Sequence, residues 1–177
     1  MSASPFETLR DFEKRSLIHA VGLPEQALAQ GTWSGIAFQV ADLNLVSEIS
    51  DIVEILTVPS LTRVPGSKSW VMGVANVRGT LVPVIDFRLF LDGTRSTQSK
   101  YSRVLVVQQS GGVVGLLIDE VQGQRHFLAE EVSGSQHFAE HTIGPYLTRE
   151  YLKGDDYWGA VDFARLVNNP VFMQAAA

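Results

Sequence analysis

The chain contains no cysteine among its 177 residues. This absence excludes disulfide bonds, a thiolate nucleophile and every zinc site that depends on cysteine ligands. No stretch reaches the ~20 apolar residues that a membrane-spanning helix needs. The N-terminus carries Glu7 and Asp11 where a secretion signal would be basic and then apolar. We therefore expect a cytoplasmic protein that does not insert directly into a membrane.

The common catalytic motifs are also absent. The sequence has no phosphate-binding loop GxxxxGK[ST], dinucleotide fingerprint GxGxxG, nucleophile elbow GxSxG or zinc-binding HExxH. His137 and His141 are spaced to chelate a metal on a helix, but no third ligand accompanies them. Adjacent acids such as Asp119 and Glu120 would point to opposite faces of a strand instead of converging on one pocket. We expect no enzymatic activity, no cofactor and no metal site, with a hydrolase as the weakest alternative.

Charge is unevenly distributed along the chain. There are 14 Lys+Arg against 19 Asp+Glu, a formal charge of −5. Residues 63–103 nevertheless contain seven basic and two acidic side chains, so this segment is +5 and the rest of the chain is −10. Such a segment can attract an acidic partner, or its charges can simply keep surface loops in water. The residues alone leave both interpretations open.

Residues 4–21 are predicted to form an amphipathic helix. Ser4 can cap its start, and Glu7 completes a capping box with Ser4. Apolar side chains then recur with the helical period, until Gly22 and Pro24 end the pattern. A helix of this kind packs on its own domain more often than it binds another protein.

From residue 33 onward the pattern has the period of two that is typical of half-buried strands. Short apolar runs separated by glycine or proline at ~8–12-residue spacing indicate an all-β sandwich or barrel. The predicted strands are residues 36–40, two within 45–56 joined by a turn, 81–85, 104–109, 113–118, 124–127, 141–143, 149–152 and 157–161. Ser110-Gly111-Gly112 predicts a hairpin turn, and Asp162 predicts the cap of a short helix that ends before Asn169-Pro170. No parallel β-α-β rhythm is visible.

The most informative run spans residues 70–86. Gly73 and Gly79 bracket a short apolar segment whose polar members are Asn76 and Arg78. Glycines allow tight bends or close backbone approach, and asparagine satisfies the backbone groups of turns. An arginine among apolar neighbours needs a carboxylate partner. Arg78 therefore either anchors the fold or is presented to another protein.

Six motifs become informative when they are taken together. They are, in order, IVEI (52–55), LTRVP (61–65), GVANVRG (73–79), PVIDFR (83–88), VLVV (104–107) and GLLIDEV (115–121). In this order they resemble the V-x-E-I, T-R-I/V-P, GVxNLRG and P-V/I-x-D-L-R elements and the paired hairpin of CheW-like chemotaxis coupling domains. The resemblance covers residues 35–167. The residues differ mildly from those usual in the family at Ile52, Val77 and Phe87.

The resemblance implies an all-β fold of two interlocked, roughly five-stranded barrels of the SH3 or OB type, with an N-terminal helix and a short C-terminal helix. Residues 1–34 would be a helical extension, residues 35–170 the CheW-like domain and residues 171–177 a tail. The implied partners are the cytoplasmic tip of a methyl-accepting chemoreceptor and the regulatory domain of a CheA-type histidine kinase, at polar receptor arrays. The extension makes the chain most similar to family members of type IV pilus (twitching motility) chemosensory systems. No catalysis is implied.

The resemblance also implies a binding region. By position, Arg78 and Glu54 would form the Arg–Glu pair of the family near the partner surface. Removing one member of a partly buried pair would cost on the order of 3 kcal/mol. The other candidates lie beside this pair and are Ile52, Gly73, Val74, Asn76, Val77 and Gly79. Each apolar candidate could equally belong to the core.

Three other interpretations compete with this one. The chain could be a flagellar-type CheW coupling protein, an OB-type barrel that binds nucleic acid, or a regulatory fragment of a CheA-type kinase. Against nucleic acid, the chain is acidic overall, and no strand interleaves basic residues with exposed aromatic ones. Against the kinase fragment, it carries its own capped helix at residues 4–21. We expect protein partners and no nucleic acid.

Overall fold

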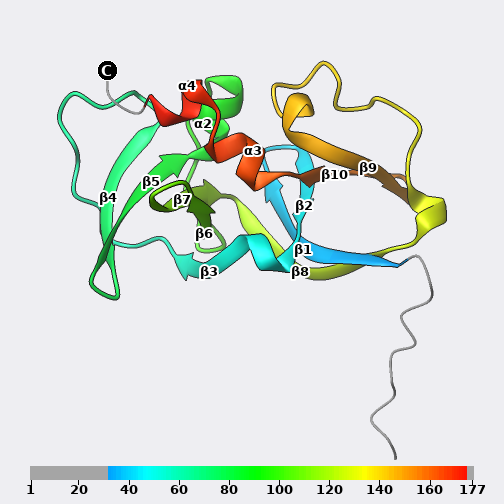
Figure 1. The fold of residues 1–177 in the computed structure, drawn as a ribbon, viewed down its shortest axis with the longest axis horizontal. Coiled ribbons are helices and arrows are strands. Elements are labelled where there is room, and N and C mark those ends of the chain that lie inside the picture. Colours follow the sequence, from blue (N-terminus) through cyan, green and yellow to red (C-terminus); the bar gives the residue numbers. More distant parts are fainter. Residues whose placement is uncertain (1–31, 175–177) are drawn as a thin grey trace, which may run out of the picture. The chain divides into compact units, whose positions relative to one another are not determined.

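A computed structural model describes residues 32–174 of the chain. The helix predicted for residues 4–21 lies outside the described residues. The described part consists of two five-stranded sheets with a few short helices, as Figure 1 shows. The prediction of an all-β fold is confirmed.

The first sheet takes its strands from the two ends of the described chain. Its strand order is β8-β1-β2-β10-β9. The bounds are Trp33–Val40 for β1, Leu43–Ser47 for β2, Glu120–Phe127 for β8, Leu147–Lys153 for β9 and Asp156–Val161 for β10. All neighbours in this sheet are antiparallel except β10 and β2, which run parallel.

The second sheet is continuous in sequence and lies between β2 and β8 along the chain. Its strand order is β3-β6-β7-β5-β4. The bounds are Ile52–Thr57 for β3, Val71–Val77 for β4, Thr80–Asp86 for β5, Arg103–Gln109 for β6 and Gly112–Ile118 for β7. The predicted hairpin around Ser110-Gly111-Gly112 is confirmed as the β6–β7 pair, whereas the parallel pairing of β5 with β7 was not foreseen.

Buried side chains form three hydrophobic clusters. One draws only on the first sheet, with Phe127 and Trp158, and another only on the second, with Val82 and Val104. The third and largest cluster combines side chains of both sheets, such as Phe38 and Leu105, with those of the short helices. Because successive strand residues point to opposite faces, a strand such as β7 supplies Leu116 to the shared cluster and Leu117 to the second sheet's own cluster. The shared cluster therefore joins the two sheets.

Three short helices and three 3₁₀ turns complete the described residues. The helices are α2 (Phe87–Asp92), α3 (Phe163–Val167) and α4 (Pro170–Met173), and the turns are η1 (Ile49–Asp51), η2 (Ala129–Glu131) and η3 (Gly144–Tyr146). Asp162 caps α3 as predicted, accepting a hydrogen bond from the Arg165 N–H. As predicted, α3 ends before Asn169-Pro170, and this pair then starts a second short helix, α4, that was not predicted. Phe172 of α4, within the range expected to be a tail, is buried in the shared cluster.

The sequence pattern did not predict β4 as a strand, and it was wrong at two other places. Residues 141–143, predicted as a strand, form a turn in which the Gly144 N–H donates to the His141 carbonyl at 2.9 Å. Ile143 is fully buried there, so its apolar character reflected burial through a turn. Helix α2 was missed, although Asp86 caps its start and Gly93, at φ 77°, ends it. A six-residue helix is too short to show a helical period.

Candidate functional site

The turn between β4 and β5 presents Arg78 in an unusual backbone conformation. Val77 pairs with Thr80, so the connection consists of Arg78 and Gly79 alone. Both residues have a left-handed backbone, with φ of 51° and 86°, and Asn76 Oδ1 accepts the Gly79 N–H at 2.8 Å. Two-residue turns of this kind favour Asn or Gly at both positions, and a larger side chain there costs about 1–2 kcal/mol. Arg78 is therefore not the residue that the turn itself would select.

The side chain of Arg78 reaches from this turn to β3. Its Nη2 lies 2.6 Å from Glu54 Oε1, so the structure brings the two expected partners together. The pair links β3, one edge of the second sheet, to the hairpin at the other edge. The Arg78 side chain is 81% exposed and that of Glu54 is 23% exposed. At this exposure the pair stabilises the fold by about 0–1 kcal/mol, less than the ~3 kcal/mol expected of a partly buried pair.

Gly73 has a structural role, because a neighbouring segment passes close to its backbone. Thr62 and Val74 exchange two backbone hydrogen bonds of 2.9 and 2.8 Å beside it. A Cβ atom at position 73 would lie 2.5 Å from the Thr62 carbonyl oxygen, and the φ of 149° also favours glycine. This buried glycine shapes the hairpin and offers no side chain to a partner.

The apolar candidates differ in where they point. Ile52 packs against the cluster shared by both sheets, and Val77 packs against the cluster of the second sheet. Val74 belongs to neither cluster; it alternates with buried Ala75 and therefore lies on the outer face of β4, as Asn76 does. Of the three, Val74 is thus the one that packs against no described cluster.

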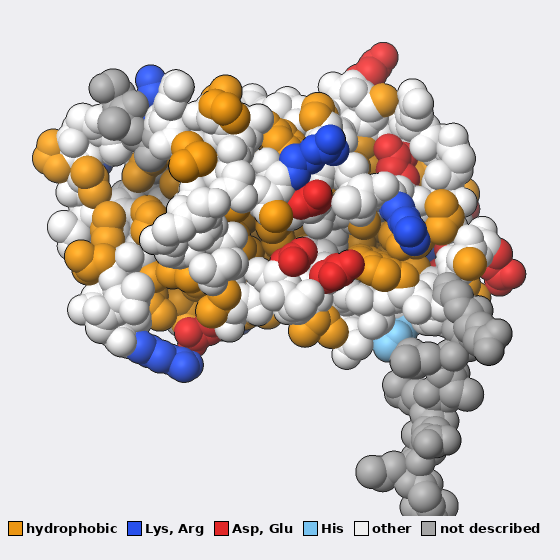
Figure 2. Space-filling view, viewed as in Figure 1, with side chains coloured by type: hydrophobic (Ala, Val, Ile, Leu, Met, Phe, Trp, Pro, Cys, Tyr) orange, Lys and Arg blue, Asp and Glu red, His pale blue; other side chains and the backbone are white. Residues whose placement is uncertain are grey.

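Exposed apolar residues outside the candidate set lie on β3 and β5, the strands that hold Glu54 and follow the Arg78 turn. Leu81 is 71% exposed and lies opposite Asn76 in the β4–β5 ladder, while Val53 and Ile55 of β3 are 57% and 39% exposed. Figure 2 shows such hydrophobic side chains at the surface over the second sheet. The alternation of Leu81 with buried Val82 was the sequence signal that could have located this outer face. The second sheet thus presents an exposed cation and exposed apolar residues, the combination typical of a protein-binding surface.

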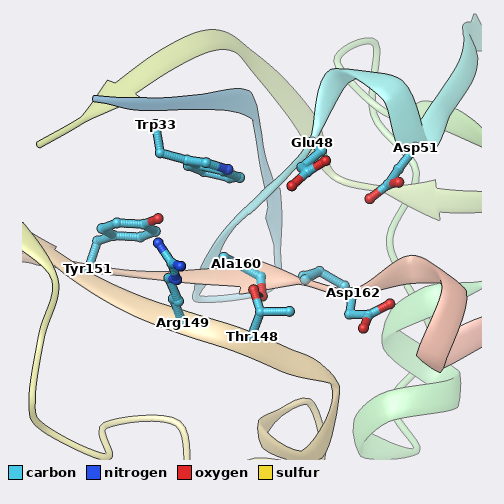
Figure 3. A pocket seen from close by; sticks show the side chains of 9 residues that line it. Trp33, Glu48, Asp51, Thr148, Arg149, Tyr151, Ala160 and Asp162 are labelled. Atoms are coloured by element: carbon cyan, nitrogen blue, oxygen red, sulfur yellow. Dashed lines mark hydrogen bonds between the residues drawn. The ribbon is translucent and has the colours of Figure 1, made fainter. Parts of the chain in front are cut away.

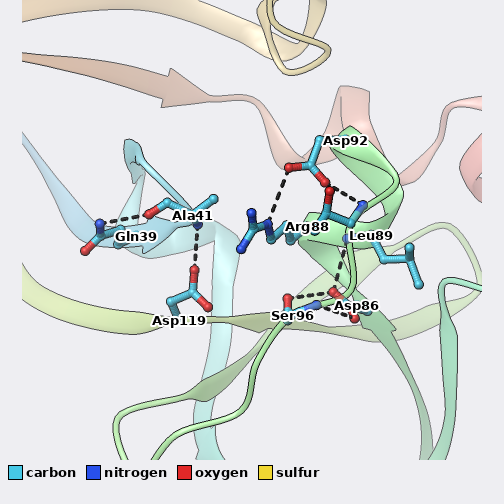
Figure 4. Close-up of polar contacts among 9 residues, drawn as sticks. Gln39, Ala41, Asp86, Arg88, Leu89, Asp92, Ser96 and Asp119 are labelled. Atoms are coloured by element: carbon cyan, nitrogen blue, oxygen red, sulfur yellow. Dashed lines mark hydrogen bonds and ion pairs between the residues drawn. The ribbon is translucent and has the colours of Figure 1, made fainter.

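Other charged motif residues have structural roles. Asp86 is 1% exposed, and its carboxylate accepts hydrogen bonds from the Leu89 N–H (3.1 Å), the Ser96 N–H (3.0 Å) and the Ser96 hydroxyl (2.7 Å), as drawn in Figure 4. It therefore caps α2 and anchors the loop that follows. Arg88 pairs with Asp92 one helical turn away at 3.4 Å.

Asp119, in the motif GLLIDEV, links the two sheets through hydrogen bonds. It lies between β7 of the second sheet and β8 of the first. Its carboxylate accepts the Ala41 N–H at 2.6 Å (Figure 4), and its own N–H donates to the Gln39 carbonyl at 3.0 Å. Ala41 has a left-handed φ of 55°, which this hydrogen bond helps to maintain.

The two histidines considered from the sequence as metal ligands lie near each other within residues 32–174 without a converging third ligand. No group of three or more potential metal ligands converges there, and the rings of His137 and His141 lie 6.2 Å apart. His137 instead stacks on Tyr157, with ring centroids 4.1 Å apart. In the same range, no helix combines the length and the apolar character that crossing a membrane requires.

The chain is similar in sequence and in fold to known proteins. A family described as the CheW-like domain matches residues 34–170. Protein PilI of Pseudomonas aeruginosa is 39% identical over 81% of this chain and 81% of its own length. The chemotaxis protein CheW of Helicobacter pylori is 35% identical over 49% of this chain and 52% of its own. The crystal structure of the scaffolding protein TtCheW from Thermoanaerobacter tengcongensis matches 77% of this chain and 88% of its own with a TM-score of 0.67, a likeness of fold at 22% identity.

Proposed function

The chain belongs to the CheW-like domain family of chemosensory coupling and scaffold proteins, and on this basis we propose that it is a non-enzymatic adaptor. It couples the cytoplasmic tip of a chemoreceptor to the regulatory domain of a CheA-type histidine kinase. The adaptor acts in the cytoplasm at polar receptor arrays and needs no cofactor. Residues 35–170 constitute the coupling domain, and residues 1–34 are an extension to it.

The exposed Arg78 is the observation that carries the proposal. Arg78 lies in a left-handed turn that favours Asn or Gly, and its side chain is 81% exposed. The fold would therefore be at least as stable with Asn or Gly at this position. Glu54 orients the Arg78 guanidinium at the surface, and Leu81, which closely follows the turn, supplies exposed apolar area. An oriented arginine with an apolar surround is the kind of group that dominates binding energy at protein interfaces.

Arg78→Asn separates recognition from folding. An Asn-Gly turn is the favoured sequence here, so the hairpin is retained while the charge is removed. We expect the Kd for the kinase regulatory domain or the receptor tip to rise at least tenfold, about 1.4 kcal/mol, while the Tm is unchanged or higher. Arg95→Ala is the matched control, since it removes an exposed cation that forms no ion pair within the described residues. Unchanged binding by Arg78→Asn, or an equal loss in the control, would contradict the assignment.

The proposed pathway is the chemosensory control of type IV pili. It is supported by the similarity to PilI, which extends over a larger share of this chain than the similarity to the Helicobacter pylori CheW protein. Deletion of the gene is expected to abolish twitching and to leave flagellar swimming intact. The opposite pattern would assign the chain to a flagellar system.

A further inference from the structure

A pocket of about 430 Å³ opens beside the first sheet, away from the Arg78 hairpin. Its walls come from β1, η1, β9, β10 and the residue that caps α3. The side chains that matter for its chemistry are Trp33, Glu48, Asp51, Arg149, Tyr151 and Asp162, drawn in Figure 3. This volume is within the usual range of roughly 300–1,000 Å³ for small-ligand sites.

One wall combines aromatic rings with a cation. Trp33 and Tyr151 stack with ring centroids 5.5 Å apart and planes 15° apart, and Tyr151 is only 1% exposed. The guanidinium of Arg149 lies beside the Tyr151 hydroxyl in Figure 3. Burial raises the pKa of Tyr151, and the neighbouring Arg149 charge acts in the opposite direction. The wall thus presents a positive charge next to a neutral phenol and an indole ring.

The facing wall carries three carboxylates. Glu48 precedes η1, Asp51 belongs to it, and Asp162 uses one oxygen to accept the Arg165 N–H at 2.8 Å. Partial burial raises the pKa of Asp51, and the charges of Glu48 and Asp162 raise it further, so no cation offsets this group. Among residues 32–174 the ion pairs are Arg78–Glu54, Arg88–Asp92 and Lys153–Glu131. Arg149 and the three acids therefore face each other across the pocket without pairing.

We propose that this pocket binds a zwitterionic group, with an ammonium or guanidinium at Glu48, Asp51 and Asp162 and a carboxylate at Arg149. Such a ligand satisfies both charged walls at once through charge-assisted hydrogen bonds, and its carbon atoms cover the Trp33 ring. A ligand of one charge would leave the opposite wall uncompensated. A free amino acid and a salt-bridged side-chain pair on a protein share this chemistry. The inference does not rest on the adaptor function.

The test uses the full chain and L-arginine as the probe. We expect L-arginine to move the indole N–H resonance of Trp33 with a Kd on the order of 1 mM, and to leave that of Trp70, outside the pocket, in place. Asp51→Asn and Arg149→Gln each weaken binding about tenfold, whereas Asp155→Asn, outside the pocket, does not. Agmatine, which lacks the carboxylate, binds more weakly than L-arginine. The melting curve of each variant verifies that it is folded.

Three results would overturn the proposal. They are no shift at about 50 mM L-arginine, equal affinity of agmatine and L-arginine, and unchanged affinity in the two pocket variants. A capture assay with the double variant Asp51→Asn/Arg149→Gln then identifies the source. If the double variant no longer captures the receptor or kinase domain, the natural ligand of the pocket is a salt-bridged side-chain pair on that protein. If capture is intact, the natural ligand is a free zwitterion. Because the L-arginine titration contains no partner protein, its failure leaves the Arg78 result unaffected.

Discussion

A charged residue lies at each end of β5, and the two differ in burial. At the start of the strand, Arg78 lies in an exposed turn with one ion pair, in a backbone conformation that favours other residues. At its end, Asp86 is buried and accepts three hydrogen bonds. A charge that is buried and satisfied serves the fold, whereas an exposed charge on a disfavoured backbone is available for recognition. Both residues belong to neighbouring motifs, so motif membership alone does not distinguish these roles.

Replacement of Asp86 tests the structural end of this comparison and has the largest expected effect. Asp86→Ala removes the cap of α2 and leaves the donors of Leu89 and Ser96 without their acceptor. We therefore expect the free energy of unfolding to fall by about 3 kcal/mol. Chemical denaturation monitored by circular dichroism measures it. Asp92→Ala, an exposed acid of the same helix, should cost below about 1 kcal/mol. If Asp86→Ala and Asp92→Ala lower the free energy of unfolding equally, the buried Asp86 has no special structural role.

The exposed end should show weak coupling. In a double-mutant cycle of Arg78→Asn and Glu54→Gln, we expect a coupling free energy below about 1 kcal/mol, because the Arg78 side chain is largely in water. Arg78→Asn alone leaves the free energy of unfolding unchanged or raises it by up to ~1 kcal/mol, since the left-handed strain is relieved. A coupling near 3 kcal/mol would instead make the pair a structural anchor.

Asp51 extends the comparison to a partly buried charge that has no cation beside it, and the effect expected of its replacement is the smallest. Its folded-state pKa is raised above 3.8, first by burial and then by Glu48 and Asp162. The folded state therefore binds this proton more tightly than the unfolded state, and the associated stability is present below pH 3.8 and lost as the pH rises through the folded pKa. Asp51→Asn should stabilise the protein at pH 7 by a few tenths of a kcal/mol after solvent screening. This gain should disappear in melts below pH 3.8; a gain that persists there would refute the interpretation.

Local patterns predicted the strands well but not all of the connections. Alternating apolar residues and Gly111 were enough for the β6–β7 hairpin, because its contacts are local. The buried side chain of Ile143 led to a false strand, since burial through a turn leaves the same apolar signal. Helix α2 was missed because six residues do not display a period, although its cap and its terminating glycine were readable.

The Arg78–Glu54 pair was predictable from the motifs, whereas the orientation of the apolar residues was not. Motif resemblance pointed to Arg78 and Glu54, which are 24 residues apart, and the fold of the second sheet is what brings them within 2.6 Å. Leu81 was not foreseen as part of the surface, and Val77 and Ile52 proved to pack against buried clusters. Apolar residues look alike in a sequence, because only the arrangement of neighbouring strands decides which face is covered.

The amino-acid sequence by itself determined the class of fold, the β6–β7 hairpin and the family, because each depends on local periodicity, turn chemistry or the order of short motifs. Only the tertiary structure decided which charges are buried, which are exposed and which face each other. Arg149 and Asp51 are 98 positions apart in the chain and line one pocket because β9 and η1 are brought together around the first sheet. Burial and charge proximity are properties of packed neighbours, and distance along the chain does not encode them.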